Sequence, residues 1–138
     1  MSYFINPVEA DQCIFLEYEG TVPPRQVIAA RDSAAGLLAA RRWNRIVADI
    51  TEIRTLPLTR EFFILYVLVR GLARKIPPSA RVALVIRPEQ ELQARFIESV
   101  ARKDGVFLTC FFDPEAATAW VKGMNSPDAK LATTGAPP

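Results

Sequence analysis

The sequence of 138 residues contains no histidine and only two cysteines. The lack of histidine excludes Ser-His-Asp triads and most catalytic zinc sites, in which imidazole is the commonest ligand. Cys13 and Cys110 each lie in an apolar, strand-like run, where a free thiol behaves as a small buried hydrophobe. Two cysteines also make no disulfide framework. We therefore predict two buried thiols, with no metal and no cofactor.

The chain also lacks a marked charge excess and a long hydrophobic run. Its 17 basic and 15 acidic side chains give a net charge of +2, which is too even for a typical nucleic-acid binder. The longest unbroken apolar run, 62–69, is far shorter than the roughly 20 residues that a membrane-spanning helix needs. The first residues do not combine a basic region with an apolar core, as a signal peptide would. We expect no nucleic-acid partner, no transmembrane segment and a cytoplasmic location.

Short β-branched runs alternate with segments of helical spacing, a pattern that predicts an α/β domain. We expect strands at 3–5, 13–19, 46–50, 81–86 and 106–112, and helices at 26–42, 59–75, 88–103 and 114–122. The predicted order is β-β-α-β-α-β-α-β-α, with four helices around a mixed, mostly parallel sheet. The first two strands are so close in sequence that they must pair antiparallel. The domain spans 1–123, and the Ser-, Pro- and Ala-rich segment 124–138 is expected to be disordered.

The predicted helix at 59–75 contains the apolar run 62–69, which alone could equally be a buried strand. Its flanks favour a helix, because Thr59 can cap it, Glu61 falls in its first turn and cationic residues occupy its end. Pro77-Pro78 then stops it. The segment is also too long for a typical strand.

Three motifs in register resemble one family. They are Tyr18-Glu-Gly20 before the first predicted helix, Arg41-Arg-Trp-Asn-Arg-Ile-Val-Ala-Asp49, and Phe111-Phe-Asp-Pro-Glu-Ala-Ala-Thr-Ala-Trp120. They resemble the STAS/Sec14-like group, also called SpoIIAA-like after the sporulation anti-anti-sigma factor, and the resemblance covers about residues 3–122. The resemblance implies a STAS-like fold and a regulatory or binding role without catalysis.

In anti-anti-sigma factors of this group, the third strand leads into an Asp-Ser-Ser-Gly-type turn, and a kinase partner phosphorylates a serine at the start of the next helix. The corresponding segment here, 49–59, lacks the Ser-Ser-Gly signature. Thr51, Thr55 and Thr59 remain as possible acceptors in the loop that begins at Asp49.

The first functional hypothesis is protein interaction or ligand sensing at the loop 49–59 and the helix 59–75. Amide groups at the helix start, with Thr59 and the guanidinium of Arg54 or Arg60, would favour a phosphate or carboxylate. The alternative is that Thr59 only caps its helix and that both arginines are solvated.

The second hypothesis is binding of a lipid or another apolar molecule. The helix 59–75 is apolar all round, and the sheet can cover only one of its sides. Another helix, a ligand, a membrane surface or a second copy of the chain must cover the rest. Burial against a neighbouring helix or in a homodimer is favoured over a lipid pocket. The candidate contact residues are Phe62, Phe63, Tyr66 and Val69.

The third hypothesis is an enzyme that uses Asp49, Glu52, Glu61 and Tyr66. The sequence has no Gly-rich phosphate loop, no metal cluster and no acid–base pair with a typical spacing. We therefore predict that the chain is not an enzyme.

Overall fold

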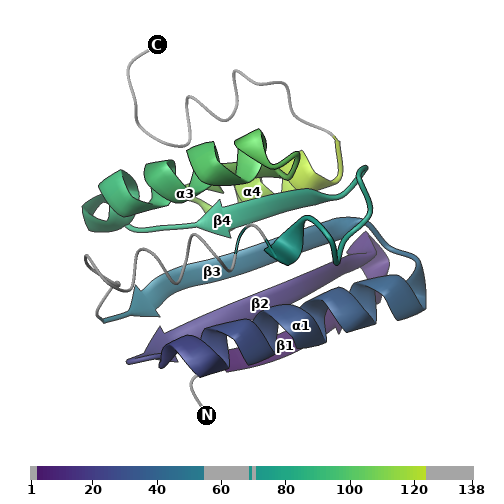
Figure 1. Ribbon diagram of the computed structural model, residues 1–138, viewed down its shortest axis with the longest axis horizontal. Coiled ribbons are helices and arrows are strands. Elements are labelled where there is room, and N and C mark those ends of the chain that lie inside the picture. The colour runs from purple at the N-terminus through teal and green to yellow at the C-terminus, as the bar shows by residue number, and fades with distance from the viewer. Residues whose placement is uncertain (1–2, 55–68, 70, 124–138) are drawn as a thin grey trace.

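The computed structural model describes residues 3–54, 69 and 71–123, which form an α/β domain built on a five-stranded mixed sheet (Figure 1). The strands lie in the spatial order of the sequence. They are β1 (Tyr3–Val8), β2 (Cys13–Gly20), β3 (Arg45–Ile53), β4 (Arg81–Val85) and β5 (Phe107–Phe111). The helices in this part of the chain are α1 (Pro24–Arg41), α3 (Glu91–Lys103) and α4 (Pro114–Val121).

The strand pairing confirms the predicted mixed sheet. β1 pairs antiparallel with β2, and β2, β3, β4 and β5 are all parallel. The first strand was predicted too short, at 3–5, because β1 continues through Asn6 and Pro7 to Val8. Proline is tolerated there because β1 lies at the edge of the sheet, where an amide that points away from β2 has no ladder partner to lose.

The predicted order with four helices stays a prediction, because the helix predicted at 59–75 falls largely outside the described residues. Within that range Val69, Gly71 and Leu72 are helical, and a turn at 73–75 follows them. The segment 124–138, predicted to be disordered, also lies outside the described residues.

The two faces of the sheet have different covers. On the first face, α1 packs over β1 and β2, and α3 packs over β5; on the second face, α4 packs over β3 and β4. The second face is densely filled: the Trp120 ring of α4 meets Phe111 and Phe107 at centroid distances of 5.6 and 5.0 Å. Asp113 starts α4 as predicted, with its carboxylate accepting the Glu115 amide.

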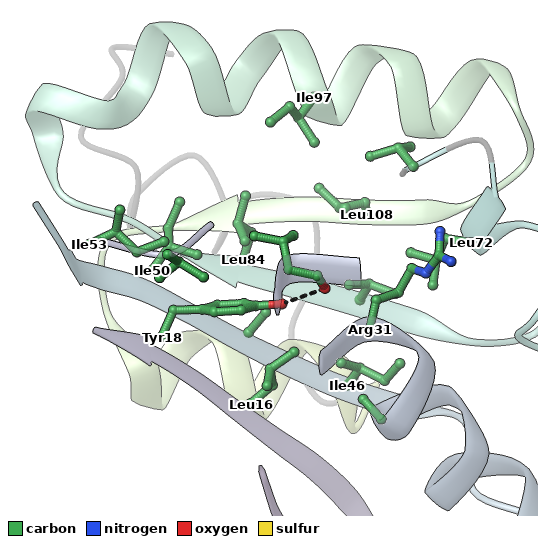
Figure 2. A pocket seen from close by; sticks show the side chains of 16 residues that line it. Leu16, Tyr18, Arg31, Ile46, Ile50, Ile53, Leu72, Leu84, Ile97 and Leu108 are labelled. Carbon is green, nitrogen blue, oxygen red and sulfur yellow. Dashed lines mark hydrogen bonds between the residues drawn. The ribbon is translucent and has the colours of Figure 1, made fainter. Parts of the chain in front are cut away.

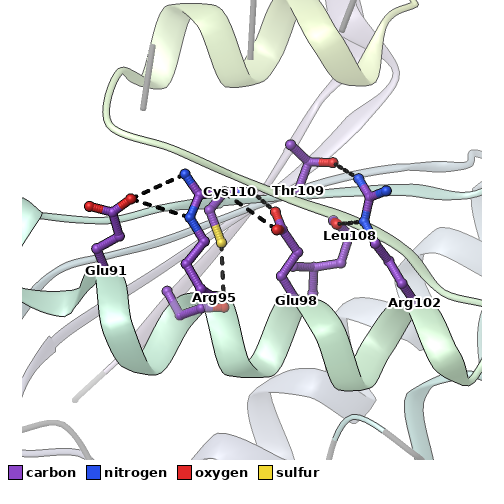
Figure 3. A network of polar contacts seen from close by, with 8 residues as sticks. Glu91, Arg95, Glu98, Arg102, Leu108, Thr109 and Cys110 are labelled. Atoms are coloured by element: carbon purple, nitrogen blue, oxygen red, sulfur yellow. Dashed lines mark hydrogen bonds and ion pairs between the residues drawn. The ribbon is translucent and has the colours of Figure 1, made fainter. Parts of the chain in front are cut away.

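Charged side chains of α3 form hydrogen bonds with the edge strand β5 (Figure 3). The Cys110 amide donates to Glu98 Oε2 at 2.9 Å, and Arg102 donates to the Leu108 carbonyl at 3.0 Å and to Thr109 Oγ1 at 2.7 Å. Backbone groups at a sheet edge would otherwise offer a template for another strand. These contacts hold α3 to β5 and satisfy part of that edge.

The orientation of α3 differs from the one that the apolar spacing predicts. Leu92 and Phe96 share helical spacing with Val100, which predicts a common buried face, but they are 82% and 46% exposed, whereas Glu98 is buried. The i,i+4 spacing of Glu98 and Arg102 predicts an ion pair on the solvated face; instead Glu98 accepts the Cys110 amide and meets Arg95 at 3.4 Å. In this orientation Glu98 satisfies the edge amide of Cys110, which would lose about 1 to 3 kcal/mol without an acceptor.

The Glu98 contact gives a stability prediction. Glu98→Ala leaves the Cys110 amide without its acceptor and should lower the free energy of unfolding by about 2 to 3 kcal/mol. Glu91→Ala is the matched control, because Glu91 also pairs with Arg95 (3.2 Å) but has a more exposed side chain; it should cost less than about 0.5 kcal/mol. Equal losses in urea-induced unfolding of the two variants would contradict this role for Glu98.

Both cysteine thiols are buried, as predicted. Burial, with a smaller contribution from the charge of Asp11, raises the pKa of the Cys13 thiol from its ordinary value of 9.0 to about 11. The folded chain therefore holds this thiol protonated at a pH at which the unfolded chain ionises it.

This shift predicts a loss of stability in alkali. The contribution of Cys13 is fully present below about pH 9 and is lost as the pH rises from about 9 to about 11, with a slope of roughly 1.4 kcal/mol per pH unit. Unfolding free energies at pH 8 and pH 10 should fall more for the wild type than for Cys13→Ala. Identical pH dependence of the two proteins would contradict the shift.

Candidate functional site

An apolar cavity of about 150 Å³, partly open to solvent, lies on the first face between α1 and α3 (Figure 2). Elements far apart in sequence form its wall, from β2 and α1 to β5. The described residues that line it are Leu16, Tyr18, Val22, Val27, Arg31, Ala34, Ile46, Ala48, Ile50, Ile53, Val69, Leu72, Val82, Leu84, Ile97 and Leu108.

The cavity wall is almost purely aliphatic. Among the described lining residues, Tyr18 and Arg31 are the ones with polar side-chain atoms. Apolar cavities of about 150 Å³ stay dry and can hold benzene or xenon. This space is therefore suited to an apolar group of about six carbon atoms rather than to water.

A β-bulge in β3 shapes one end of the cavity. Glu17 of β2 pairs with Asp49 and Glu19 pairs with Glu52, so β3 has two residues where β2 has only Tyr18. In a regular strand, residues three apart point to opposite faces. The extra residue changes this alternation, so that Ile50 and Ile53 both line the cavity.

Polar side chains from three places satisfy the backbone groups of the bulge. Asp49 Oδ1 accepts the Thr51 amide at 2.9 Å and the Thr51 hydroxyl at 2.6 Å. Arg87 donates to the Thr51 carbonyl and to the Ile53 carbonyl, the latter at 3.1 Å. Buried Gln90 donates to the Ile50 carbonyl at 2.8 Å. The bulge is thus held by one side chain of β3 itself and by two that follow β4.

Tyr18 joins the sheet to α1 at the cavity. Its ring forms part of the wall, and its hydroxyl donates to the Val27 carbonyl at 3.3 Å (Figure 2). Burial raises the pKa of the Tyr18 phenol, with a smaller contribution from Tyr3. The phenol is therefore neutral, and its hydroxyl links β2 to α1 through a hydrogen bond.

Arg31 on α1 places a positive charge beside the apolar wall. Its guanidinium contacts Asp32 Oδ1 at 2.7 Å, and Asp32 also meets Lys75 at 3.6 Å. The Arg31 side chain is 13% exposed, whereas that of Asp32 is 44% exposed. Hydrogen bonding from Arg31, and then the charges of Arg31 and Lys75, lower the pKa of the Asp32 carboxyl.

Gly71 lies directly against the Arg31 guanidinium. A Cβ atom at Gly71 would be 2.6 Å from Arg31 Nη1, closer than real contacts allow. Glycine at this position therefore lets the guanidinium lie close to the backbone beside Leu72, another cavity residue.

The residues predicted for an anion or switch site are only partly described. Asp49 and Thr51 belong to the bulge, and Arg54 is exposed and gives its backbone amide to the Gly20 carbonyl at 3.1 Å. The predicted strand at 46–50 was too short and the loop prediction was wrong for 51–53, because β3 continues beside β2 to Ile53. Thr55, Thr59 and Arg60 lie outside the described residues.

Of the four predicted apolar contact residues, one lies in the described part of the chain. Val69 is buried and lines the cavity, whereas Phe62, Phe63 and Tyr66 lie outside the described residues. Of the carboxylates considered for catalysis, Glu52 is exposed beside the bulge and Glu61 lies outside the described part.

The sequence reasoning missed most of the cavity, including Tyr18 and Arg31. One local signal was present: Arg31 lies four residues after Val27 and three before Ala34, so it interrupts the apolar stripe of α1. A charge in such a stripe indicates either a snorkelling side chain or a site.

Within residues 3–54, 69 and 71–123, no helix has the length and apolar character needed to cross a bilayer. The same residues contain no group of three or more His, Cys, Asp or Glu side chains placed to hold a metal ion. Comparison of the chain with protein-family models, with curated proteins and with solved structures finds no match.

Proposed function

We propose that this chain is a non-catalytic binding module that takes a small apolar molecule into the cavity between α1 and α3. The observation that carries the proposal is an apolar space of about 150 Å³ whose described lining consists of fourteen aliphatic side chains with Tyr18 and Arg31. A site with this wall offers shape and hydrophobic burial rather than acid–base chemistry.

The free-energy cost of leaving the cavity unfilled favours a bound ligand. At about 24 cal/mol per Å³, an unfilled apolar cavity of this size would cost up to about 4 kcal/mol. That is a large part of the 5 to 15 kcal/mol by which domains are normally stable. A ligand with an apolar body recovers much of this free energy by filling the space.

The fold supports a STAS-like module as the framework for this binding. An antiparallel first strand, parallel strands β2 to β5 and the order of the described helices are compatible with that group. In this proposal the STAS-like domain works as a ligand sensor or regulatory module without the serine switch.

The cavity proposal predicts opposite effects of one substitution on stability and on binding. Ala48→Leu extends a side chain into the space and should stabilise the fold by about 1 kcal/mol, because it fills a void. The same variant should lose binding of 1-hexanol, a neutral apolar probe, by at least about tenfold. Thermal unfolding measures the first effect and an NMR-monitored titration measures the second.

Ala83→Leu is the matched control. Ala83 lies on the neighbouring strand β4 but faces the filled second face, where it is fully buried. Overpacking there should destabilise the fold by about 1 to 3 kcal/mol and leave 1-hexanol affinity unchanged in the folded fraction. The proposal is contradicted if the wild type does not bind 1-hexanol, or if Ala48→Leu binds it as well as the wild type.

Docking of a second copy of this chain is the second candidate function. Leu92 and Phe96 lie one turn apart on α3 and are 82% and 46% exposed. Neighbouring exposed apolar side chains of this kind are typical of protein contacts. In a homodimer, the same surface would face itself across a two-fold axis.

This candidate predicts a dimer that depends on α3. Light scattering after size exclusion should give twice the chain mass for the wild type and for Ser99→Glu, which changes an exposed α3 residue. Leu92→Glu should shift the mass to that of one chain. A single-chain mass for the wild type at high protein concentration would rule the candidate out.

A further inference from the structure

We infer that the end of the domain at which strands β2 to β5 begin binds single-stranded nucleic acid. The inference does not rest on the cavity proposal. It assigns a second interaction surface and the class of partner that this surface fits.

The topology gathers basic side chains at one end of the sheet. Because β2 to β5 are parallel, their first residues lie at the same end, and α1, α3 and α4 run back to it (Figure 1). The register places Arg45, Arg81 and Phe107 side by side there. Among the described residues, seven cations belong to this end, which we call the basic end: Arg41, Arg42, Arg45, Arg81, Arg102, Lys103 and Lys122.

The net charge of +2 conceals a separation of charge along the strands. In the described part of the chain, three carboxylates accompany the seven cations of the basic end: Glu9, Asp11 and Asp104. The opposite end has four cations, which are Arg25, Arg54, Arg87 and Arg95, and eight carboxylates, which are Glu17, Glu19, Asp49, Glu52, Glu89, Glu91, Asp113 and Glu115. The even total, from which no nucleic-acid partner was expected, therefore averages two ends of opposite sign.

The helix dipoles account for only part of this basic excess. Cations near a helix C-terminus complement its dipole, and α1, α3 and α4 all end here. Each C-terminus carries about half a negative charge, so the three together offset about one and a half positive charges. The excess of seven cations over three carboxylates is larger than that, and the basic end keeps a positive field.

Five of the seven cations have no carboxylate partner in the described part of the chain. Arg45, Arg81 and Arg102 each donate to a backbone carbonyl, at 2.7, 2.7 and 3.0 Å. Arg42 and Lys103 are exposed, and none of the ion pairs among the described residues includes any of these five. A carbonyl holds a guanidinium in place without cancelling its charge, so these cations are positioned for an anionic partner.

Aromatic rings at the basic end lie against guanidinium groups. The Phe107 ring, 42% exposed, has Arg81 and Arg102 at 5.4 and 5.3 Å from its centroid. Arg41 lies 5.1 Å from the centroid of the Trp43 ring. Proteins bind single strands through phosphate contacts from cations and through bases stacked on aromatic rings or guanidinium planes. The basic end supplies both kinds of group.

Two features favour a single strand over other polyanionic partners. Peripheral membrane binding adds buried apolar side chains to charge attraction, whereas Phe107 is held between two guanidinium groups. Duplex DNA is commonly read by a helix or a β-ribbon laid in the major groove. The basic end consists of helix C-termini and strand starts, so it suits a flexible strand that lies across them.

The test compares two labelled strands of equal charge by fluorescence anisotropy. One is an oligothymidylate of about twenty nucleotides, and the other is an abasic strand with the same number of phosphates. The wild type should bind the oligothymidylate with a dissociation constant on the order of 10 μM, and log affinity should fall with log salt at a slope of about −3, as expected for about four phosphate contacts. The abasic strand should bind at least about fivefold more weakly, because it has no bases to stack.

Single-charge variants locate the surface. Arg42→Gln and Lys103→Gln each remove one exposed cation of the basic end, so each should weaken binding severalfold and reduce the salt slope by about 0.7. Arg25→Gln is the matched control, because it removes an exposed cation from the opposite end of the domain. It should leave both the affinity and the slope unchanged.

Three results would overturn the inference. The first is a wild type that binds neither strand, or that binds both with equal affinity. The second is an Arg25→Gln protein that loses as much affinity as Arg42→Gln. The third is binding to vesicles of phosphatidylcholine with about 30% phosphatidylserine but not to the oligothymidylate, which would assign the basic end to a membrane surface.

Discussion

The bulge in β3 is the constraint on which the cavity depends. β2 supplies one residue, Tyr18, where β3 supplies two, and this extra residue turns Ile50 and Ile53 to the same face. A bulge leaves backbone groups outside the regular ladder, and here Asp49, Arg87 and Gln90 bind them. These polar residues at one end of the sheet thereby set the shape of an apolar space that none of them lines. Their role is positional, and the cavity performs the proposed binding.

The contrast between the two faces of the sheet argues that the cavity is a specific feature rather than loose packing. On the second face, the aromatic rings of Phe111 and Trp120 fill the interior under α4. At the β5 edge, Glu98 and Arg102 bind backbone groups of the strand. The same chain that closes these regions leaves an aliphatic space between α1 and α3 and places Arg31 beside it. Natural interiors contain few voids of this size. A ligand that fills this one would stabilise the folded state.

The sequence predicted what local patterns determine. Five β-branched runs gave the α/β class and the mixed sheet, and the short link before Cys13 gave the antiparallel first pair. The bulge was not predictable, because it depends on the register between strands that α1 separates. Glu98 was misplaced because helical spacing does not reveal that an edge amide of β5 needs an acceptor. The cavity combines side chains from β2 to β5, so only Val69 among the candidates named from the sequence belongs to its described wall.

The most direct test of the central claim is a crystal structure of the protein under xenon pressure. Xenon enters dry apolar cavities and does not need a polar partner. Our account predicts a xenon atom on the first face, in contact with Leu16, Ala48 and Leu84, and none beneath α4. A structure in which side chains fill that space and no xenon binds there would contradict the account.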